Sequence, residues 1–341
     1  MTLLTKIFFT LIIITTLHAQ AQKSIINILD SGRKTSLRGL SVVDDNIVWA
    51  SGSNGAIARS TDGGKTFEWL TVQGYEQRDF RDVEAFDAKT ALIMAVAEPA
   101  IILKTKDGGR IWKKVFEDTT KGMFLDAMDF DESGTGAIIG DPLNGNLFKA
   151  LTVDYGDNWM ILQFVDSTYK LKDGEAFFAS SGTNIKFTGN KDYPLLYATG
   201  GTASRLFYRE NFYKLNIVQG TESTGANSVA IGNNGKNAVI VGGDFKADTI
   251  SSLNCVLVQF KKEPVFTNPQ IPPHGYRSCV EYITKDKLIT CGTSGVDVSN
   301  DGGKNWELIS THSFHVCQRA KKGTKIFLAG ASGKIAVLSA F

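Results

Sequence analysis

Long apolar runs are almost missing from this sequence. After the first 21 residues, no stretch approaches the about 20 apolar residues of a membrane-spanning helix, so we expect no membrane span in the mature chain. Charge of one sign is also scarce, because 37 basic and 35 acidic residues leave a formal net charge of +2. Such a balance provides no electrostatic footprint for nucleic acid or an anionic membrane surface, and we expect neither as a partner.

Groups that carry redox or metal chemistry are few. The chain has 4 His and 4 Cys, with no Cys-x-x-Cys-His haem motif, no glycine fingerprint for a nucleotide and no His cluster with metal spacing. We therefore expect no cofactor and no metal. The thiols Cys255, Cys279, Cys291 and Cys317 all lie late in the chain, and either disulfides or buried free thiols remain open. A hairpin of residues 276–283 and 287–293 would bring Cys279 and Cys291 face to face or nearly so.

The one long apolar run has the form of an export signal. Lys6 supplies positive charge, residues 7–17 form the apolar run, and Ala19 and Ala21 give the small-x-small pattern of a cleavage site. We expect residues 1–21 to be removed. Residues 22–341 are then predicted to form a single domain, a monomer in the periplasm or outside the cell.

Glycine, in contrast, is abundant, with 34 Gly against 7 Pro, and four turns share one layout. Each has Ser or Thr, then Asp two residues later, Gly after two more, and an aromatic residue at the end. In such an Asp-box turn, Asp accepts hydrogen bonds from backbone amides and Gly takes a positive φ. We therefore assign a structural role to the four box residues Asp62, Asp107, Asp154 and Asp301.

The boxes belong to a repeat of about 47 residues. A second marker, a strand that ends in small residues, occurs seven times: at residues 48–52, 93–97, 137–140, 196–200, 239–242, 288–292 and 326–330. Short strands that recur at this period are typical of β-propeller blades. The sequence therefore predicts an all-β, seven-bladed β-propeller. Residues 24–30 have the pattern of the strand that the last blade lacks, so we expect the N-terminal strand to close the ring.

The channel of a propeller is lined by the innermost strand of each blade. We expect these strands to begin at Leu37, Phe80, Phe124, Glu175, Ala226, Tyr276 and Phe314. On them and on nearby turns lie the candidate ligand-binding residues Arg38, Arg81, Asp82, Asp126, Asp141, Glu175, Arg205, Asp244, Arg277 and His315. Together they would form a polar funnel suited to an anionic or sugar-like ligand. The alternative, that they pair with one another and only line a wet channel, stays open.

The repeated layout Gly-x-x-Gly-x-Ile-x-x-Ser-x-Asp-Gly-Gly-x-Thr-Phe/Trp resembles the photosystem II stability and assembly factor family, and more broadly BNR/Asp-box propellers. Motifs at residues 124–128, 140–145, 174–184, 242–244 and 275–278 resemble an exported bacterial branch of that family. Photosynthetic members bind assembly partners, so the resemblance implies an exported, non-catalytic scaffold that binds a protein or an anionic or sugar-like ligand. Nothing in the chain implies photosynthesis.

Enzymatic alternatives also follow from the resemblance, because sialidases use Asp-box propellers. Arg38, Arg81 and Arg277 with Glu175 and Asp82 would imitate part of a sialidase site. The usual Arg-Ile-Pro motif is absent, however, and no Tyr-Glu pair can be located, so catalytic residues remain unknown. An oxidoreductase, a label that members of this branch often carry, is less favoured than a sialidase-like glycoside hydrolase.

Overall fold

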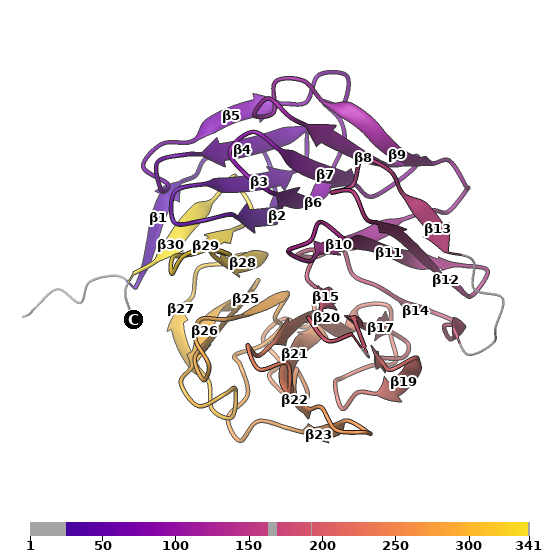
Figure 1. Ribbon diagram of the computed structural model, residues 1–341. Coiled ribbons are helices and arrows are strands. Elements are labelled where there is room, and N and C mark those ends of the chain that lie inside the picture. Colours follow the sequence, from indigo (N-terminus) through magenta and orange to yellow (C-terminus); the bar gives the residue numbers. More distant parts are fainter. Residues whose placement is uncertain (1–24, 163–168, 192, 340–341) are drawn as a thin grey trace, which may run out of the picture.

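The computed structural model describes residues 25–162, 169–191 and 193–339, and strands joined by turns and loops make up most of these ranges (Figure 1). The predicted export signal, residues 1–21, lies outside the described residues. Across the three ranges, no helix has the length and apolar character that crossing a membrane requires.

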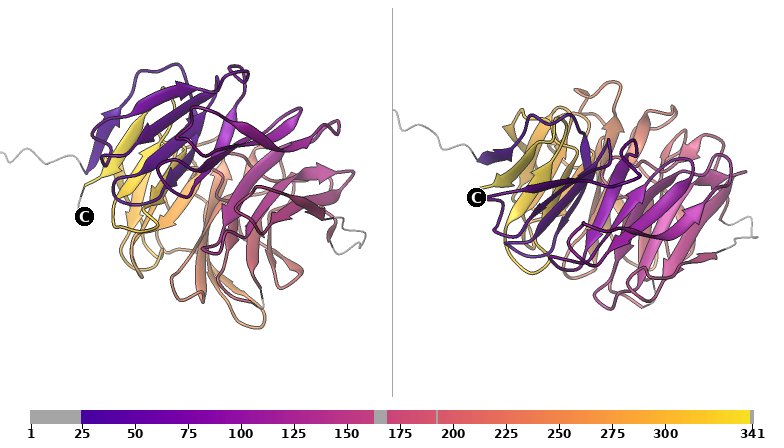
Figure 2. Two further views of the ribbon diagram at one scale, coloured as in Figure 1. Left: turned by 45° about the horizontal axis from the view of Figure 1, so that its top comes forward. Right: turned by 90° about the horizontal axis from the view of Figure 1, so that it is seen from above.

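Within the described residues, the strands form seven blades around a channel, which confirms the predicted β-propeller (Figure 1; Figure 2 shows the disc from two other directions). From the channel outward, blade 1 consists of β2 (Leu37–Val42), β3 (Val48–Gly52), β4 (Ala56–Ser60) and β5 (Glu68–Thr71). Blade 2 consists of β6 (Phe80–Ala85), β7 (Ala91–Ala95), β8 (Ala100–Thr105) and β9 (Lys113–Asp118). Blade 3 consists of β10 (Leu125–Phe130), β11 (Gly136–Leu143), β12 (Asn146–Thr152) and β13 (Met160–Leu162).

The remaining blades follow the same order. Blade 4 consists of β15 (Ile185–Phe187), β16 (Leu195–Ala198), β18 (Arg205–Tyr208) and β19 (Asn211–Lys214), and blade 5 of β20 (Thr224–Ile231), β21 (Asn237–Asp244), β22 (Cys255–Gln259) and β23 (Val265–Thr267). Blade 6 consists of β24 (Cys279–Tyr282), β25 (Leu288–Gly292), β26 (Gly295–Ser299) and β27 (Glu307–Ser310). Blade 7 consists of β28 (Val316–Arg319), β29 (Ile326–Ala329), β30 (Ile335–Leu338) and β1 (Ile26–Asp30).

The ring closes between the two ends of the chain, as predicted. Strand β1 pairs antiparallel with β30, with Ile26 opposite Leu338 and Ile28 opposite Ala336. The amide of Ser339 also donates to the carbonyl of Ile25 at 2.8 Å. Because β1 is the outermost strand of blade 7, the first described residues complete the last blade.

The apolar core lies between blades and not inside any one of them. One cluster joins Trp49 of blade 1 to Phe80 of blade 2, and another joins Leu92 of blade 2 to Leu125 of blade 3. Further clusters continue around the ring and return through Phe327 of blade 7 to Leu37 of blade 1. Each blade is a thin sheet that buries its two faces against its neighbours.

The Asp boxes are the turns between the third and fourth strands of blades 1, 2, 3 and 6. In the first, the amide of Gly64 donates to Ser60 Oγ at 2.9 Å, and Thr66 donates to both carboxylate oxygens of Asp62. In the third box, Gly156 also lies against the preceding blade, since a Cβ at this residue, where φ is +76°, would lie 2.6 Å from Leu92 Cδ1. Glycine is therefore required for the turn and for the close approach of two blades.

The structure corrects the predicted start of blade 4. Residues 175–178 were expected to form its innermost strand, but that strand is β15. Instead, β14 (Glu175–Ala176) pairs with β17 (Gly200–Gly201), and both extend the sheet of blade 5 beyond its strand β20. Blade 4 has no Asp box among its described residues, so the repeat gave no marker from which to count back to its first strand.

The predicted hairpin of blade 6 is present, and Cys279 is directly opposite Cys291 in its register. All four thiols are buried and unbridged.

Candidate functional site

A ring of side chains surrounds the end of the channel where the innermost strands begin, and we call this end the first mouth. In blades 1, 2, 3 and 5, a β-bulge at this point adds one unpaired residue to the innermost strand: Arg38, Arg81, Asp126 and Asn227. Ser278 and His315 hold the same place in blades 6 and 7. Because a bulge re-aims its side chain, six blades contribute one polar group each to the first mouth.

These residues line a cavity of about 470 Å³. Ser180, from the segment before β15, takes part for blade 4. Asp141, near the end of β11, and the rings of Phe178 and Phe245 also line it.

Two arginines provide the positive charge of the first mouth. Arg38 donates one long hydrogen bond, 3.5 Å, to the carbonyl of Ser180, and no ion pair of Arg38 is found among the described residues. Arg81 donates through Nε to Asp79 Oδ2 at 2.7 Å. Burial lowers the pKa of Arg38, and the Arg81 cation lowers it further. Two neighbouring cations with spare donors favour the binding of an anion.

Two carboxyls lie beside the arginines. Asp126 is fully buried, and neither of its oxygens has a hydrogen-bond partner of good geometry among the described residues. Burial raises its pKa well above 3.8 and the charge of Asp141 adds to this, while Arg81 and the amides of Ala179 and Asp141 lower it in part. Asp141 accepts from the amide of Phe177 at 3.1 Å, and burial raises its pKa to about 6. Burial therefore raises the pKa of both carboxyls, and Asp141, with a pKa of about 6, is mostly charged at pH 7.

His315 and Asn227 contribute neutral polar groups. Burial, together with the cations Arg38 and Arg81, lowers the pKa of His315 to about 3, so that its ring is uncharged. Its Nε2 lies 3.1 Å from Ser36 Oγ. Asn227 accepts from the hydroxyls of Tyr276 and Ser180, each at 2.9 Å. The predicted ring of cations therefore contains two arginines and a neutral histidine.

Arg277 is not part of this ring. The amide of Arg277 donates a hydrogen bond to a carbonyl of the preceding blade, as do the amides of Leu37, Leu125 and Phe314. Arg277 therefore occupies the strand position that these apolar residues hold in other blades. Its side chain is fully buried and forms an ion pair with Asp297, and it also donates to Ser294 Oγ at 2.8 Å. A shift of one residue along a strand reverses the direction of a side chain, which explains the wrong placement.

Asp82 also points away from the first mouth. Its Oδ2 accepts from the amide of Met128, in blade 3, at 2.8 Å. Four further inner strands make the same kind of link to the next blade. In these links a side chain accepts a hydrogen bond from a backbone amide: Gln318 from Val42, Ser41 from Ala85, Asp129 from Phe187, and Ser228 from Val280. Asp82 therefore belongs to a girdle that holds the inner strands together.

The other candidate residues lie beside the mouth. Glu175 is buried under Arg205, whose Nη2 lies 2.7 Å from Glu175 Oε2, and Arg205 also stacks 4.1 Å from the ring centre of Phe212. Asp244 ends β21 and accepts from the amide of Lys246 at 2.9 Å. The pair Glu175–Arg205 fixes β14 against blade 4, and Asp244 caps a turn.

The opposite end of the channel, the second mouth, opens into a cavity of about 660 Å³. Two ion pairs lie in its lining: Lys186 donates to Asp129 at 3.2 Å, and Lys321 contacts Glu84. Burial raises the pKa of Glu281 to about 7, against the effect of Lys186. The Asp boxes lie on this face, because the third strand of a blade runs parallel to the first.

Sequence reasoning missed Asn227, Ser180 and the rings of Phe178 and Phe245. Asn227 follows Ala226 as Arg38 follows Leu37, so the aligned repeat contained its signal. Ser180 and Phe178 precede a strand whose position was misjudged, and Phe245 lies in a loop outside the repeat. No sequence signal marked those three.

The fold is shared with several solved structures. YCF48 bound to D1 peptide has a TM-score of 0.61 at 14% identity, over 93% of this chain and 98% of its own. YCF48 from Cyanidioschyzon merolae has a TM-score of 0.64 at 15% identity, over 92% of this chain and 98% of its own. The GH74 xyloglucanase from Xanthomonas campestris has a TM-score of 0.57 at 13% identity, over 91% of this chain and 53% of its own. At these identities the likeness shows the fold alone.

The sequence comparisons are narrower. No curated protein matches this chain significantly. Residues 18–166 match the family described as photosynthesis system II assembly factor YCF48. The predicted resemblance is thus confirmed: the chain is a seven-bladed β-propeller that resembles the YCF48 assembly factor family, whose profile matches residues 18–166.

Proposed function

We propose that this chain is a non-catalytic binding protein that holds an acidic segment of a partner protein at the first mouth. The observation that carries the proposal is the pair Arg38 and Arg81. Both guanidinium groups lie at one cavity, and Arg38 forms no ion pair with any described carboxylate. A carboxylate of a partner protein could therefore accept charge-assisted hydrogen bonds from these arginines.

A peptide is favoured over a sugar by one comparison and one structural feature. A solved YCF48 holds a D1 peptide, so a propeller of this fold has taken a peptide in that protein. In this chain the accessible wall of the cavity includes the rings of Phe124, Phe178 and Phe245, which suit peptide side chains.

The proposal is tested with fluorescently labelled acidic peptides and fluorescence polarisation. Arg38→Ala and Arg81→Ala should each weaken binding at least about tenfold, because each removes a hydrogen bond between charged groups. Arg319→Ala is the matched control, since it removes the same charge at the second mouth, and it should change affinity less than about twofold. Equal losses at both mouths would place the site elsewhere.

A glycoside hydrolase remains the second candidate, on the observation that Asp126 and Asp141 line one cavity and that burial raises the pKa of both carboxyls. A carboxyl whose pKa is raised by burial is typical of the general acid of such enzymes, which works with a second carboxyl. The sialidase-like set is not assembled, however, because Arg277, Glu175 and Asp82 are engaged elsewhere. Turnover of aryl glycosides that disappears in Asp141→Asn would favour this candidate over a binding protein.

We also propose that the chain is exported and processed after Ala21. The support is the pattern of Lys6, the apolar residues 7–17 and the small residues Ala19 and Ala21. Mass spectrometry of the N-terminus of the protein from its native cell should find Gln22 first. An intact Met1 in cytosolic material would contradict export.

A further inference from the structure

Aromatic rings form a row along one side of the first mouth. The rings of Phe178 and Phe245 meet edge to face with centroids 6.2 Å apart, and those of Phe245 and Tyr276 do so at 6.3 Å. Tyr276 is buried, whereas Phe245 is 44% exposed. The row therefore ends in a large apolar surface that faces solvent at the rim of the cavity.

The row is held in place by its surroundings. The backbone at Gly200 leaves room for Phe178, since a Cβ there would lie 2.3 Å from Phe178 Cε2. The Phe245 amide donates to the carbonyl of Ser223 at 3.2 Å, and the Tyr276 hydroxyl donates to Asn227. A surface that is ordered before binding loses little conformational entropy when a ligand arrives.

The loop that carries Phe245 adds more apolar surface. Residues 245–254 connect β21 to β22, and within this loop Ile250 is 54% and Leu253 is 44% exposed. Leu253 has φ of +54°, a conformation that is costly for a residue with a Cβ. The loop is tied to the mouth because Asp248 accepts from the amide of Tyr276 and from Thr293 Oγ1, at 2.8 and 2.6 Å.

The apolar row and the arginines meet at one short segment. Arg38 donates to the carbonyl of Ser180, and the amide of Ser180 donates to the carbonyl of Phe178 at 2.8 Å. All of these residues line the same cavity of about 470 Å³. A carboxylate held by Arg38 and Arg81 would therefore have the aromatic row within reach of its neighbouring side chain.

We propose that the first mouth selects partner segments in which a large apolar side chain lies within two positions of the acidic group, and that this side chain packs on Phe245 and Phe178. The inference rests on the proposed function and deepens it. The arginines supply the charge complementarity, and the exposed ring supplies an apolar anchor of the kind that dominates protein interfaces.

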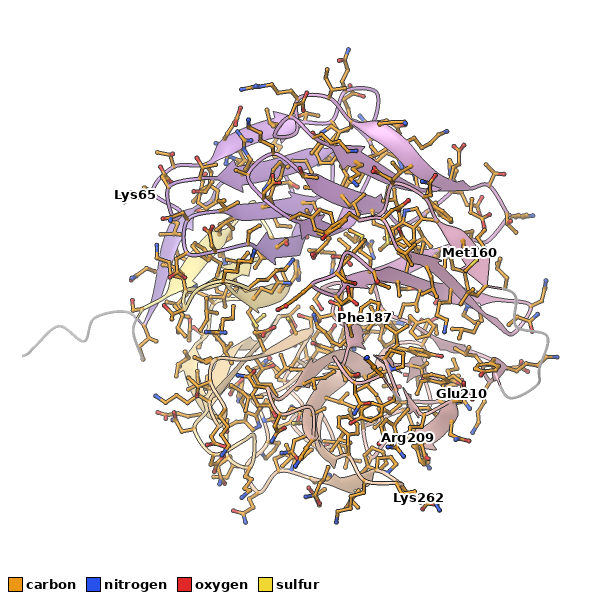
Figure 3. All side chains as sticks on the ribbon, viewed as in Figure 1. Lys65, Met160, Phe187, Arg209, Glu210 and Lys262 are labelled. Carbon is orange, nitrogen blue, oxygen red and sulfur yellow. The ribbon has the colours of Figure 1, made fainter. Side chains whose placement is uncertain are left out.

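The test uses twelve labelled Gly/Ser peptides. Four contain one Asp with Phe at position −2, −1, +1 or +2; four have Ser in place of Phe; and four have Asn in place of Asp. With the wild-type protein, the best Phe peptide should bind about tenfold tighter than its Ser partner. Phe245→Ala should reduce this ratio below about threefold, and Phe245→Leu should restore most of it. Met160→Ala, which removes a 61% exposed side chain at the rim of blade 3 (Figure 3), is the control.

The outcomes separate the two proposals. If Asp peptides bind through Arg81 but Phe and Ser peptides bind equally, the apolar subsite is wrong and the acidic site stands. If no peptide binds and methyl glucuronide binds instead, both proposals are wrong. Melting temperatures of all variants should stay within a few degrees of the wild type, and a collapse of Phe245→Ala would shift the comparison to Phe245→Leu against Phe245→Ser.

Discussion

At the scale of single residues, Arg277 offers a sharp test because it sits in the core and not at the ligand site. Its guanidinium is the partner of the buried Asp297, so Arg277→Ala leaves that carboxylate unpaired. We expect a loss of about 3–5 kcal/mol in the free energy of unfolding. Arg81→Ala should cost less than about 1 kcal/mol, because its ion pair with Asp79 is partly exposed. Urea denaturation measures both, and equal losses would contradict this assignment.

Asp141 makes stability depend on pH in a defined direction. Its pKa is about 6 in the folded chain against 3.8 when unperturbed, so the folded state resists ionisation and loses stability as the pH rises from about 4 to about 6. Asp141→Asn should therefore stabilise the protein at pH 7.5, by about 2 kcal/mol, and the gain should vanish as the pH falls to about 4. His315, with a pKa of about 3, stays neutral between these pH values, so it does not obscure the difference. A gain that is constant with pH would refute the shifted pKa.

The candidate site was predictable only in part, and the β-bulges explain why. Arg38, Arg81 and His315 reach the mouth because each follows the leading apolar residue of its strand, which the sequence shows. Asp126 also lies there, but its leading residue is Leu125 and not Phe124. In the sequence, Arg277 looks equivalent to Arg38 and Arg81, but in the structure it lies one position earlier along its strand. An unpaired residue in a strand leaves no mark in composition, yet it decides which side chain faces the channel.

At the scale of elements, strand β1 allows a test of whether closure of the ring stabilises the fold, because it carries one buried and one exposed isoleucine. Ile26 is 3% exposed and packs into the cluster of blades 6, 7 and 1, whereas Ile28 on the same strand is 40% exposed. Ile26→Ala should reduce the free energy of unfolding by about 2–4 kcal/mol, and Ile28→Ala by less than about 1 kcal/mol. Thermal or urea melts of the two variants provide the comparison. Similar small effects would mean that β1 adds little to the closed ring.

The blades themselves were largely readable from the sequence, because each strand that ends in small residues proved to be the second strand of a blade. Residues 48–52 are β3, and residues 288–292 are β25. Blade 4 was the exception. There the inner strand β15 follows a long segment that departs from the repeat and joins blade 5. Such an exchange between sheets depends on tertiary packing, and local sequence patterns do not encode it.

At the scale of the molecule, the blades are coupled around the whole ring. Apolar clusters bridge adjacent blades, and the girdle links inner strands through Gln318, Ser41, Asp82, Asp129 and Ser228. The closing pair β1 and β30 lies within blade 7, where it joins the two ends of the chain in one sheet. What matters for stability is that every neighbouring pair exists, wherever the chain begins.

A circular permutant tests this view. Ser339 can be joined to Ile25 through an Asn-Gly turn, because the two strands already form an antiparallel pair. New ends between Lys262 and Glu263 fall in an exposed turn at the rim (Figure 3), so that β23 becomes the closing strand of blade 5. The permutant should unfold in one transition within about 5 °C of the wild type and keep its affinity for acidic peptides. A chain that starts at Gly32 lacks β1 and should melt far lower. If the permutant melts with that truncated chain, the order of the strands, and not closure of the ring, would determine stability.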